Sequence, residues 1–232
     1  MNMNNESQIH LDLSNYEWGP TDERTKELLT LEFGTNKIYN IHHEVNEGDI
    51  VLDVGASTGI WTYSILPKKP KFVLCVEPSK TEFPCLVKNT LGHPVTHLNK
   101  AITKGNGSTD EIQSYYYSGP VETITFKSLV ELYGLNHINF LKTDCEGGEY
   151  AIFLPEHYPF LRNNVDVIVG EFHLENPEQN ILFRQFRDNF LAHHPNFRVH
   201  AVDCVDIMWD LWNEHFLEYY KQVIVHIDNR NL

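Results

Sequence analysis

The sequence predicts an α/β fold in which a doubly wound, mostly parallel seven-stranded sheet ends in an antiparallel last strand. Two observations lead to this prediction. Apolar strand-like runs alternate with helical patterns five times along the chain, which is typical of βαβ units around a parallel sheet. Two later strand-like runs, 197–202 and 222–227, are joined by an irregular stretch without a convincing long helix. Such an ending favours an antiparallel final strand.

The size of the chain fits one such domain. It has 232 residues, of which 41% are hydrophobic, and it contains neither a flexible linker nor an internal repeat. We expect the domain to span residues 46–232. Residues 1–45 are expected to form an N-terminal arm and a helix that pack on it. That helix should begin at Thr21-Asp22-Glu23, where polar side chains can cap free N–H groups, and end near Gly34.

Charge and composition narrow the class of protein. Eighteen Lys and Arg against 32 Asp and Glu give a formal net charge of −14, and no run of basic residues is present. Nucleic acid is therefore a poor partner. No export signal is apparent, no apolar run approaches the roughly 18 residues of a membrane span, and the four cysteines lack CxxC or metal-finger spacing. We expect a cytoplasmic protein with reduced thiols and no membrane association; the sequence does not indicate an oligomeric state.

The first predicted strand, Ile50–Val54, runs into the small-residue loop Gly55–Gly59 and then into a helix. Glycines lack the Cβ atoms that would keep a ligand away from the backbone, and the free N–H groups at the helix start face that ligand. A dinucleotide fingerprint requires Gly-x-Gly-x-x-Gly, whereas this loop has Ser57 in the middle and Asp53 before it. An acid at that place suits a cationic amino group and a sulfonium better than a pyrophosphate.

The second predicted strand, Lys71–Val76, ends in Glu77-Pro78. Glu77 lies 22 residues after Gly55, a position from which an acid can accept both ribose hydroxyls. Small Ala101, at the end of the third strand, could lie under an adenine. The pattern favours a nucleoside without phosphates, so S-adenosylmethionine fits better than NAD. The residues expected to bind this cofactor are Asp53, Gly55, Ala56, Ser57, Thr58, Gly59, Glu77, Pro78, Ala101 and Asp144.

The remaining elements follow in chain order. Helices are expected at 80–91, 128–132, from 149 onwards and at 177–191. Strands are expected at 95–102, 138–143 and 165–169, with a hairpin or irregular excursion over 112–117 and 121–126. The fourth strand ends at Asp144, and the fifth leads into Glu171-Phe172-His173. Because open α/β sheets bind ligands at the carboxyl ends of their strands, these acids and the histidine belong to the predicted site.

Together these motifs resemble the FkbM family of S-adenosylmethionine-dependent methyltransferases. The matching blocks, in the family's order, are DVGASTG at 53–59, EP at 77–78, LKTDCEGGE at 141–149 and EFH at 171–173. The resemblance covers roughly residues 45–175, and its specific part is the third block. Ser57, Cys145 and Gly148 depart from the usual family residues. The resemblance implies a class I, Rossmann-like methyltransferase fold and O-methylation of a hydroxyl on a sugar, glycan or small natural product.

Methyl transfer to a hydroxyl requires that the acceptor oxygen be aligned and its proton removed. We expect His173 to be the general base, because the ordinary pKa of histidine lies near neutrality. Glu171 or Asp144 would orient it, and no metal ion would be needed. In an alternative mechanism, Asp144 and Glu171 hold a divalent cation that fixes and acidifies the hydroxyl. A small-molecule or glycan acceptor is the expected partner.

Other interpretations stay open. Glu146 and Glu149 precede a helix, where carboxylates stabilise the N-terminus without any catalytic role. The pairs His42-His43 and His193-His194 are interpreted as surface histidines rather than metal ligands, because adjacent side chains point apart. An NAD-dependent oxidoreductase with a relaxed fingerprint, or a cofactor-binding module without catalysis, would also fit parts of the pattern.

Overall fold

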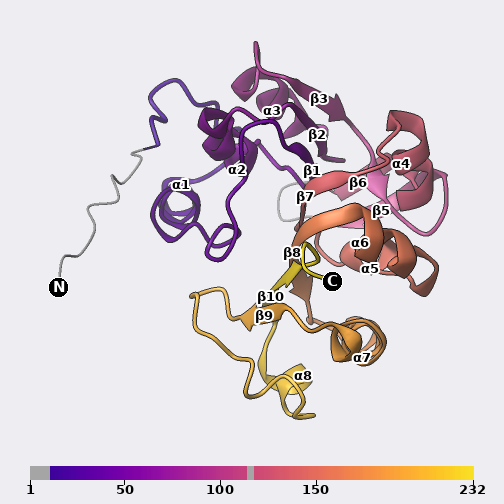
Figure 1. Cartoon of the computed structure of the whole chain (residues 1–232). Helices are drawn as coiled ribbons and strands as arrows, with labels where there is room; N and C mark the ends of the chain where they lie inside the picture. Colours follow the sequence, from indigo (N-terminus) through magenta and orange to yellow (C-terminus); the bar gives the residue numbers. More distant parts are fainter. Residues whose placement is uncertain (1–10, 114–117) are drawn as a thin grey trace.

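The computed structural model describes residues 11–113 and 118–232, which are organised around a seven-stranded sheet (Figure 1). Its strands are β1 (Ile50–Val54), β2 (Phe72–Val76), β3 (Val95–Leu98), β7 (Ile138–Thr143), β8 (Val165–His173), β9 (Phe197–His200) and β10 (Gln222–Asp228). They lie in the order β3-β2-β1-β7-β8-β10-β9, and only β10 runs antiparallel to its neighbours within this described sheet. The predicted doubly wound sheet with an antiparallel last strand is confirmed.

The apolar residues of each central strand divide between two buried clusters, one on each face of the sheet. Along β1, Leu52 and Val54 belong to one cluster and Val51 to the other. This is the period-two alternation of a strand. Because both faces are covered, the strand is apolar throughout rather than alternately polar, apart from the buried Asp53. The long apolar runs in the sequence reflect this double burial.

Helices cover both faces of the sheet (Figure 1). The side chains of α2 (Ile60–Ile65) and α3 (Phe83–Asn89) join one buried cluster, together with the N-terminal segment. The helices that join the other cluster are α4 (Phe126–Tyr133), α5 (Glu149–Ile152), α6 (Tyr158–Asn164) and α7 (Pro177–Asn189). A last short helix, α8 (Phe216–Tyr219), precedes β10. Within the described residues, none of these helices has the length and apolar character needed to span a membrane.

A small second sheet follows β3. It contains β4 (Ala101–Ile102), β5 (Gly107–Gln113) and β6 (Ser118–Ile124) in the order β4-β6-β5. The antiparallel pairing of β5 with β6 confirms a hairpin here, but its strands begin several residues earlier than the predicted 112–117 and 121–126, and 114–117 lie outside the described residues. The third strand predicted at 95–102 is too long. The chain leaves the main sheet at Asn99, whose side-chain amide donates to the carbonyls of Glu77 and Pro78 at 2.8 and 3.1 Å.

The N-terminal helix is longer than predicted. Its regular part, α1 (Glu23–Thr30), begins after Asp22, whose carboxylate accepts a hydrogen bond from the Thr25 N–H at 2.9 Å. Gly34 does not end the helix. The chain continues as a π-helix over Leu31–Asn36 and stops at Lys37, which adopts a left-handed conformation with φ 50°. Residues 38–45 then pack against the sheet, in the buried cluster that also contains Val51.

Two further boundaries differ from the sequence prediction. Helix α4 is capped by Thr125 rather than Ser128, because the Thr125 hydroxyl accepts a hydrogen bond from the Ser128 N–H at 3.1 Å. Strand β8 continues to His173 because β10 pairs with it from Val167 to His173. Glu171 and His173 therefore lie on a rigid strand and not in a loop.

Candidate active site

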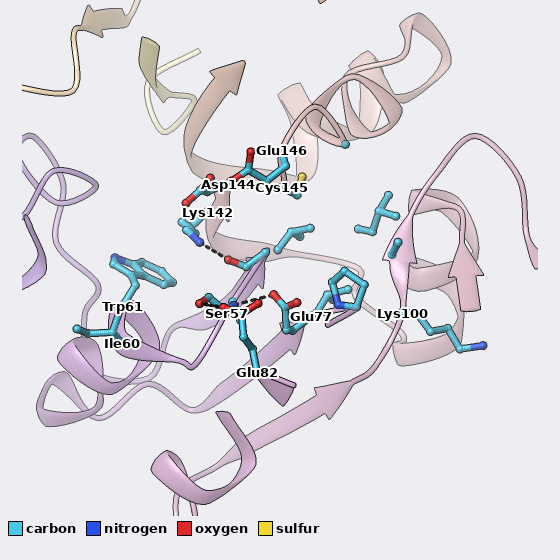
Figure 2. Close-up of a pocket in the computed structure, with 18 of the residues that line it drawn as sticks. Ser57, Ile60, Trp61, Glu77, Glu82, Lys100, Lys142, Asp144, Cys145 and Glu146 are labelled. Atoms are coloured by element: carbon cyan, nitrogen blue, oxygen red, sulfur yellow. Dashed lines mark hydrogen bonds between the residues drawn. The ribbon is translucent and has the colours of Figure 1, made fainter. Parts of the chain in front are cut away.

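A cavity of about 350 Å³ opens at the carboxyl ends of β1, β2 and β7 (Figure 2). The strand order reverses between β1 and β7, and open α/β sheets bind ligands at such a point. The predicted site residues that line this cavity are Gly55, Ala56, Ser57, Glu77, Pro78, Ala101 and Asp144. The predicted residues that lie outside its lining are Asp53, Thr58, Gly59, Glu171 and His173.

At Gly55 the loop after β1 lies against the loop after β7, at the bottom of the cavity. Its φ is +74°, and a Cβ added there would lie 1.6 Å from the carbonyl oxygen of Asp144. The two loops approach backbone to backbone, since the Asp144 N–H donates to the Val54 carbonyl at 2.9 Å. On the other side, the Gly55 N–H donates to the Val76 carbonyl at the end of β2, also at 2.9 Å. No side chain larger than hydrogen fits at this crossing.

Thr58 and Gly59 support the loop from behind. Gly59 has φ +88°, and a Cβ there would lie 2.7 Å from Cδ1 of Leu86 in α3. The Thr58 carbonyl accepts hydrogen bonds from the Tyr16 hydroxyl and the Asn89 side-chain amide, both at 2.8 Å. Neither residue lines the cavity, and their expected cofactor contacts stay predictions. Their surroundings are α3 and the N-terminal arm.

Asp53 also lies beneath the loop, fully buried. Its Oδ2 accepts a hydrogen bond from the Thr62 hydroxyl at 2.6 Å, and its Oδ1 lies 3.2 Å from Nζ of Lys142. Lys142 in turn donates to the Gly55 carbonyl at 2.7 Å. Burial by itself lowers the pKa of Lys142, but the charges of Asp53 and Asp144 raise it above its ordinary value. In this structure Asp53 holds Lys142, which holds the loop, and the expected contact of Asp53 with a cationic ligand stays a prediction.

Glu77 faces the cavity, and each of its carboxylate oxygens accepts a hydrogen bond from a backbone N–H group. Oε2 accepts a hydrogen bond from the Ser57 N–H at 2.8 Å, and Oε1 accepts one from the Ser79 N–H at 2.7 Å. Glu82 also lines the cavity and accepts a hydrogen bond from the Ser57 hydroxyl at 2.6 Å. Burial and the charge of Glu82 raise the pKa of Glu77 to about 8. A ligand hydroxyl that donates to Glu77 would favour its ionised form, as ribose hydroxyls can.

Asp144 lies on a different side of the opening from Glu77 (Figure 2). The Tyr39 hydroxyl lies 2.9 Å from Oδ2 of Asp144 and 2.7 Å from Oε2 of Glu171. A phenol has one proton, so it donates to only one of these carboxyl groups at a time. Burial and the charge of Asp144 raise the pKa of Glu171 to about 8. This raised pKa favours a protonated Glu171 near neutral pH, and Tyr39 lies between the two acids.

His173 pairs with the acids of the loop after β7. Its Nδ1 lies 3.1 Å from Oε1 of Glu149, and its Nε2 lies 3.5 Å from Oε2 of Glu146. Burial works to lower the pKa of His173, but the hydrogen bond and charge of Glu149, with further acids nearby, outweigh it and raise the pKa to about 10. An imidazolium has no lone pair with which to accept a proton. The raised pKa disfavours His173 as the general base, and its expected role in catalysis stays a prediction.

One group of residues at this edge could hold a metal ion. Asp144, Glu149 and His173 each bring one possible ligand atom within 4.8 Å of the others. Histidine binds metals as a neutral imidazole, so the charged His173 would first have to release its proton. The other pair considered, Asp144 and Glu171, is bridged by Tyr39. That the chemistry needs no metal stays a prediction.

Three residues of the site, Tyr39, Glu82 and Lys142, were not predicted from the sequence. The role of Lys142 could have been predicted from the sequence, because a lysine inside a buried strand requires an acidic partner. That partner is Asp53, its register neighbour in β1. Tyr39 had no such signal, since it is separated from its two acids by 105 and 132 residues.

The sheet order and the cavity at its switch point are those of a class I methyltransferase fold. The model of the methyltransferase FkbM domain matches residues 32–199, more than half of the chain. The chain therefore belongs to the FkbM methyltransferase family, and the predicted resemblance is confirmed. Family and fold support an S-adenosylmethionine-dependent methyltransferase. No curated protein sequence matches the chain.

Solved structures are similar to this chain at low sequence identity. A chain of the fibrillarin/Nop5p complex is 11% identical, with coverage of 85% of this chain and 80% of that one and a TM-score of 0.51. A precorrin-6y C5,15-methyltransferase from Geobacter metallireducens is 11% identical, with coverage of 94% and 96% and a TM-score of 0.49. An O-methyltransferase from Bacillus cereus in complex with SAH is 12% identical, with coverage of 93% and 85% and a TM-score of 0.44. These likenesses concern the fold alone.

Proposed function

We propose that this protein transfers a methyl group from S-adenosylmethionine to a hydroxyl group of a sugar, a glycan or a small natural product. The observation that carries the proposal is the position of Asp144. Its carboxylate lines the cavity on a different side from Glu77 and is held by the Tyr39 hydroxyl at 2.9 Å. One acid can therefore bind the ribose while the other meets the acceptor.

The shape and lining of the cavity suit a nucleoside with an amino-acid tail. Its polar part is the loop Gly55–Ser57 with Glu77, where backbone groups and one carboxyl lie close together. Its remaining wall includes the apolar side chains of Leu29, Phe33 and Ile102. An adenine can lie against such a surface, as small-molecule pockets combine apolar walls with a few fixed polar groups.

The charges around the cavity favour this cofactor over a dinucleotide. Of the lysines that line it among the described residues, Lys142 is engaged by Asp53, and Lys100 lies 2.9 Å from the carboxylate of Glu122. A pyrophosphate would meet the carboxyl of Glu77 without an unpaired cation to balance its charge. This arrangement, together with the family, supports a methyltransferase over the oxidoreductase alternative.

Asp144 is the group best placed to take the proton of the acceptor. The cofactor supplies a methyl group already activated by a sulfonium, so the protein must align the acceptor oxygen and remove its proton. Oδ2 of Asp144 accepts a hydrogen bond from Tyr39, which leaves Oδ1 for the acceptor hydroxyl. Tyr39, Glu171 and His173 act as positioning residues, because they hold Asp144 and the charge balance around it without lining the cavity.

The charge of the chain supports a neutral acceptor. The formal net charge is −14, and Glu146 is exposed at the rim of the cavity. A phosphate backbone would be repelled at such a surface. The buried Glu171 and His173 beside Asp144 also argue against a module without catalysis, because groups with strongly shifted pKa values gather mainly at functional sites.

The test combines cofactor binding with a choice among acceptors. Calorimetry should show binding of S-adenosylmethionine, and NADH should not bind. The protein and methyl-labelled cofactor are then incubated with a panel of sugars, oligosaccharides and phenols, and with amines and RNA as the opposing panel. Mass spectrometry and NMR should find the label on oxygen of a neutral hydroxyl compound. Transfer only to nitrogen or to RNA would overturn the proposal.

A further inference from the structure

Three histidines from distant parts of the chain meet on one face of the sheet. They are His42, in the segment after the π-helix, His200 at the end of β9, and His226 in β10. Each brings a ring nitrogen within 4.8 Å of one from each of the others, and the Nε2 atoms of His42 and His200 are 2.6 Å apart. The cluster could not be predicted from adjacent histidine pairs, because His42 meets partners more than 150 residues away in the sequence.

His226 lacks the partner that a structural histidine normally has. Its side chain is 1% exposed, and neither ring nitrogen has a hydrogen-bond partner among the described residues. A buried polar group without a partner destabilises the fold. A neutral imidazole with an unused lone pair, next to two further imidazoles, is a ready metal ligand.

We propose that His42, His200 and His226 bind a transition-metal ion, with Zn²⁺ the best fit. Zinc takes three imidazoles with water as a fourth ligand. A Zn–N length of 2.0–2.1 Å in tetrahedral geometry sets the nitrogens about 3.3 Å apart. The rings of His42 and His200 must therefore separate slightly, and the exposed His42 is free to do so. His200 is oriented for this role, since its Nδ1 lies 3.3 Å from the Cys204 carbonyl and leaves Nε2 facing the site.

The metal would fasten the segment that carries Tyr39. In the sheet, Ile224 of β10 pairs with Glu171 of β8 and with His200 of β9, so these residues lie on one face. The N-terminal segment packs on that face and contacts Glu171 through Tyr39 and His200 through His42, three residues later. A metal ion between His42 and the two strands would therefore hold Tyr39 in place between its acids. Metal binding itself does not depend on the proposed methyl transfer.

The first experiment measures metal affinity on the full chain. The protein is stripped with a chelator and titrated with Zn²⁺ by calorimetry, and with Co²⁺ by its visible absorption. His42→Ala removes one ligand at an exposed position and should lower Zn²⁺ affinity at least ~100-fold, beyond the 10- to 100-fold typical of losing an outer-shell partner. The matched control is His43→Ala, whose ring lies 3.1 Å from Arg230 and outside the cluster, and which should bind Zn²⁺ as the parent does.

A second variant separates this site from the acids near the cavity. His173→Gln should keep Zn²⁺ binding at the three-histidine site. If His173→Gln loses the metal and His42→Ala keeps it, or if the parent chain binds no Zn²⁺ at micromolar concentration, the proposal is wrong. Hydrogen exchange tests the role of the metal: amides of 38–45 should exchange more slowly with Zn²⁺ in the parent but not in His42→Ala. Binding without slower exchange would contradict the fastening of Tyr39.

Discussion

The loop Gly55–Gly59 and the cluster around Tyr39, which contains Asp144 and Glu171, differ in how far apart in the sequence their contacting residues lie. In the loop, backbone N–H groups hold the turn, since those of Gly55 and Ala56 donate to the Val76 carbonyl, and Ser57 meets Glu77 and Glu82 over separations of 20 and 25 residues. In the cluster, a tyrosine from the N-terminal segment meets two acids that lie 105 and 132 residues away. Substitutions in the loop should therefore act through the fold and cofactor affinity. Substitutions in the cluster should act through turnover and pH dependence.

The largest effect is expected for Gly55→Ala. The new Cβ would lie 1.6 Å from a backbone oxygen, in a conformation with φ +74°, and neither loop can move away without breaking strand pairing. We expect a loss of more than about 4 kcal/mol in the free energy of unfolding, the range of the most disruptive single substitutions. Urea denaturation followed by circular dichroism measures it.

Two other glycines serve as controls for Gly55→Ala. Gly48 has φ +89° but open space around it, so Gly48→Ala isolates the conformational strain, about 1–2 kcal/mol. Gly59→Ala should fall between them, because the sub-van-der-Waals contact of its Cβ is with Cδ1 of the Leu86 side chain, at 2.7 Å, and not with backbone. Equal losses in all three variants would show that strain, and not the crossing of two loops, makes Gly55 necessary.

This contrast explains what the sequence could predict. The strands, the loop and Glu77 follow from local patterns, because period-two burial and a glycine turn leave traces in neighbouring residues. The roles of Asp53 and His173 could not be assigned in that way. Asp53 faces Lys142 and His173 faces Glu149, and which partner a buried charged group finds depends on packing between separate elements. Tyr39 could not be predicted for the same reason, because the acids it contacts lie 105 and 132 residues away and its own segment was expected to be an N-terminal arm.

The second prediction tests which residue removes the proton. Asp144→Asn keeps the shape of the side chain but removes its basicity, so turnover should fall ~10²- to 10⁴-fold while S-adenosylmethionine still binds. His173→Gln should lower turnover less, because His173 is charged and lies outside the cavity lining. The turnover of each variant is measured as the rate of formation of the methylated acceptor. Its affinity for S-adenosylmethionine is measured by calorimetry, and the two measurements together show which residue is the base. A larger loss in His173→Gln would restore the histidine as the base.

The third prediction concerns the ribose end of the cavity. Glu77→Gln replaces one carboxylate oxygen by an NH₂ group that faces a backbone N–H, and it removes the charge that ribose hydroxyls would favour. Cofactor affinity should fall by about 1.5–3 kcal/mol, the worth of hydrogen bonds to a charged group. Glu82→Gln is the matched control: its amide oxygen still accepts the Ser57 hydroxyl, so its loss should be smaller. Calorimetric titration of both variants measures the difference.

The last prediction concerns the pH dependence of stability, where the change per pH unit is smaller than the effects above, and it tests the cluster around Tyr39. The pKa of Glu171 rises from 4.5 to about 8 on folding, so the folded chain holds the extra proton between these values. The stability from this proton is fully present below about pH 4.5 and is lost as pH rises towards 8, with a slope of at most about 1.4 kcal/mol per pH unit. Glu77 and His173, whose pKa values are also raised, add slopes of the same sign over about 4.5–8 and 6.5–10.

The stability curve of the parent therefore contains contributions from several groups. The informative quantity is the difference in stability between the parent and Glu171→Gln, measured by urea denaturation at each pH unit from 5 to 8. The variant has no proton to lose at this position, so its stability should decline less steeply across that window. Parallel curves would mean that Glu171 is ionised throughout, and Tyr39 would then face two carboxylates with a single proton.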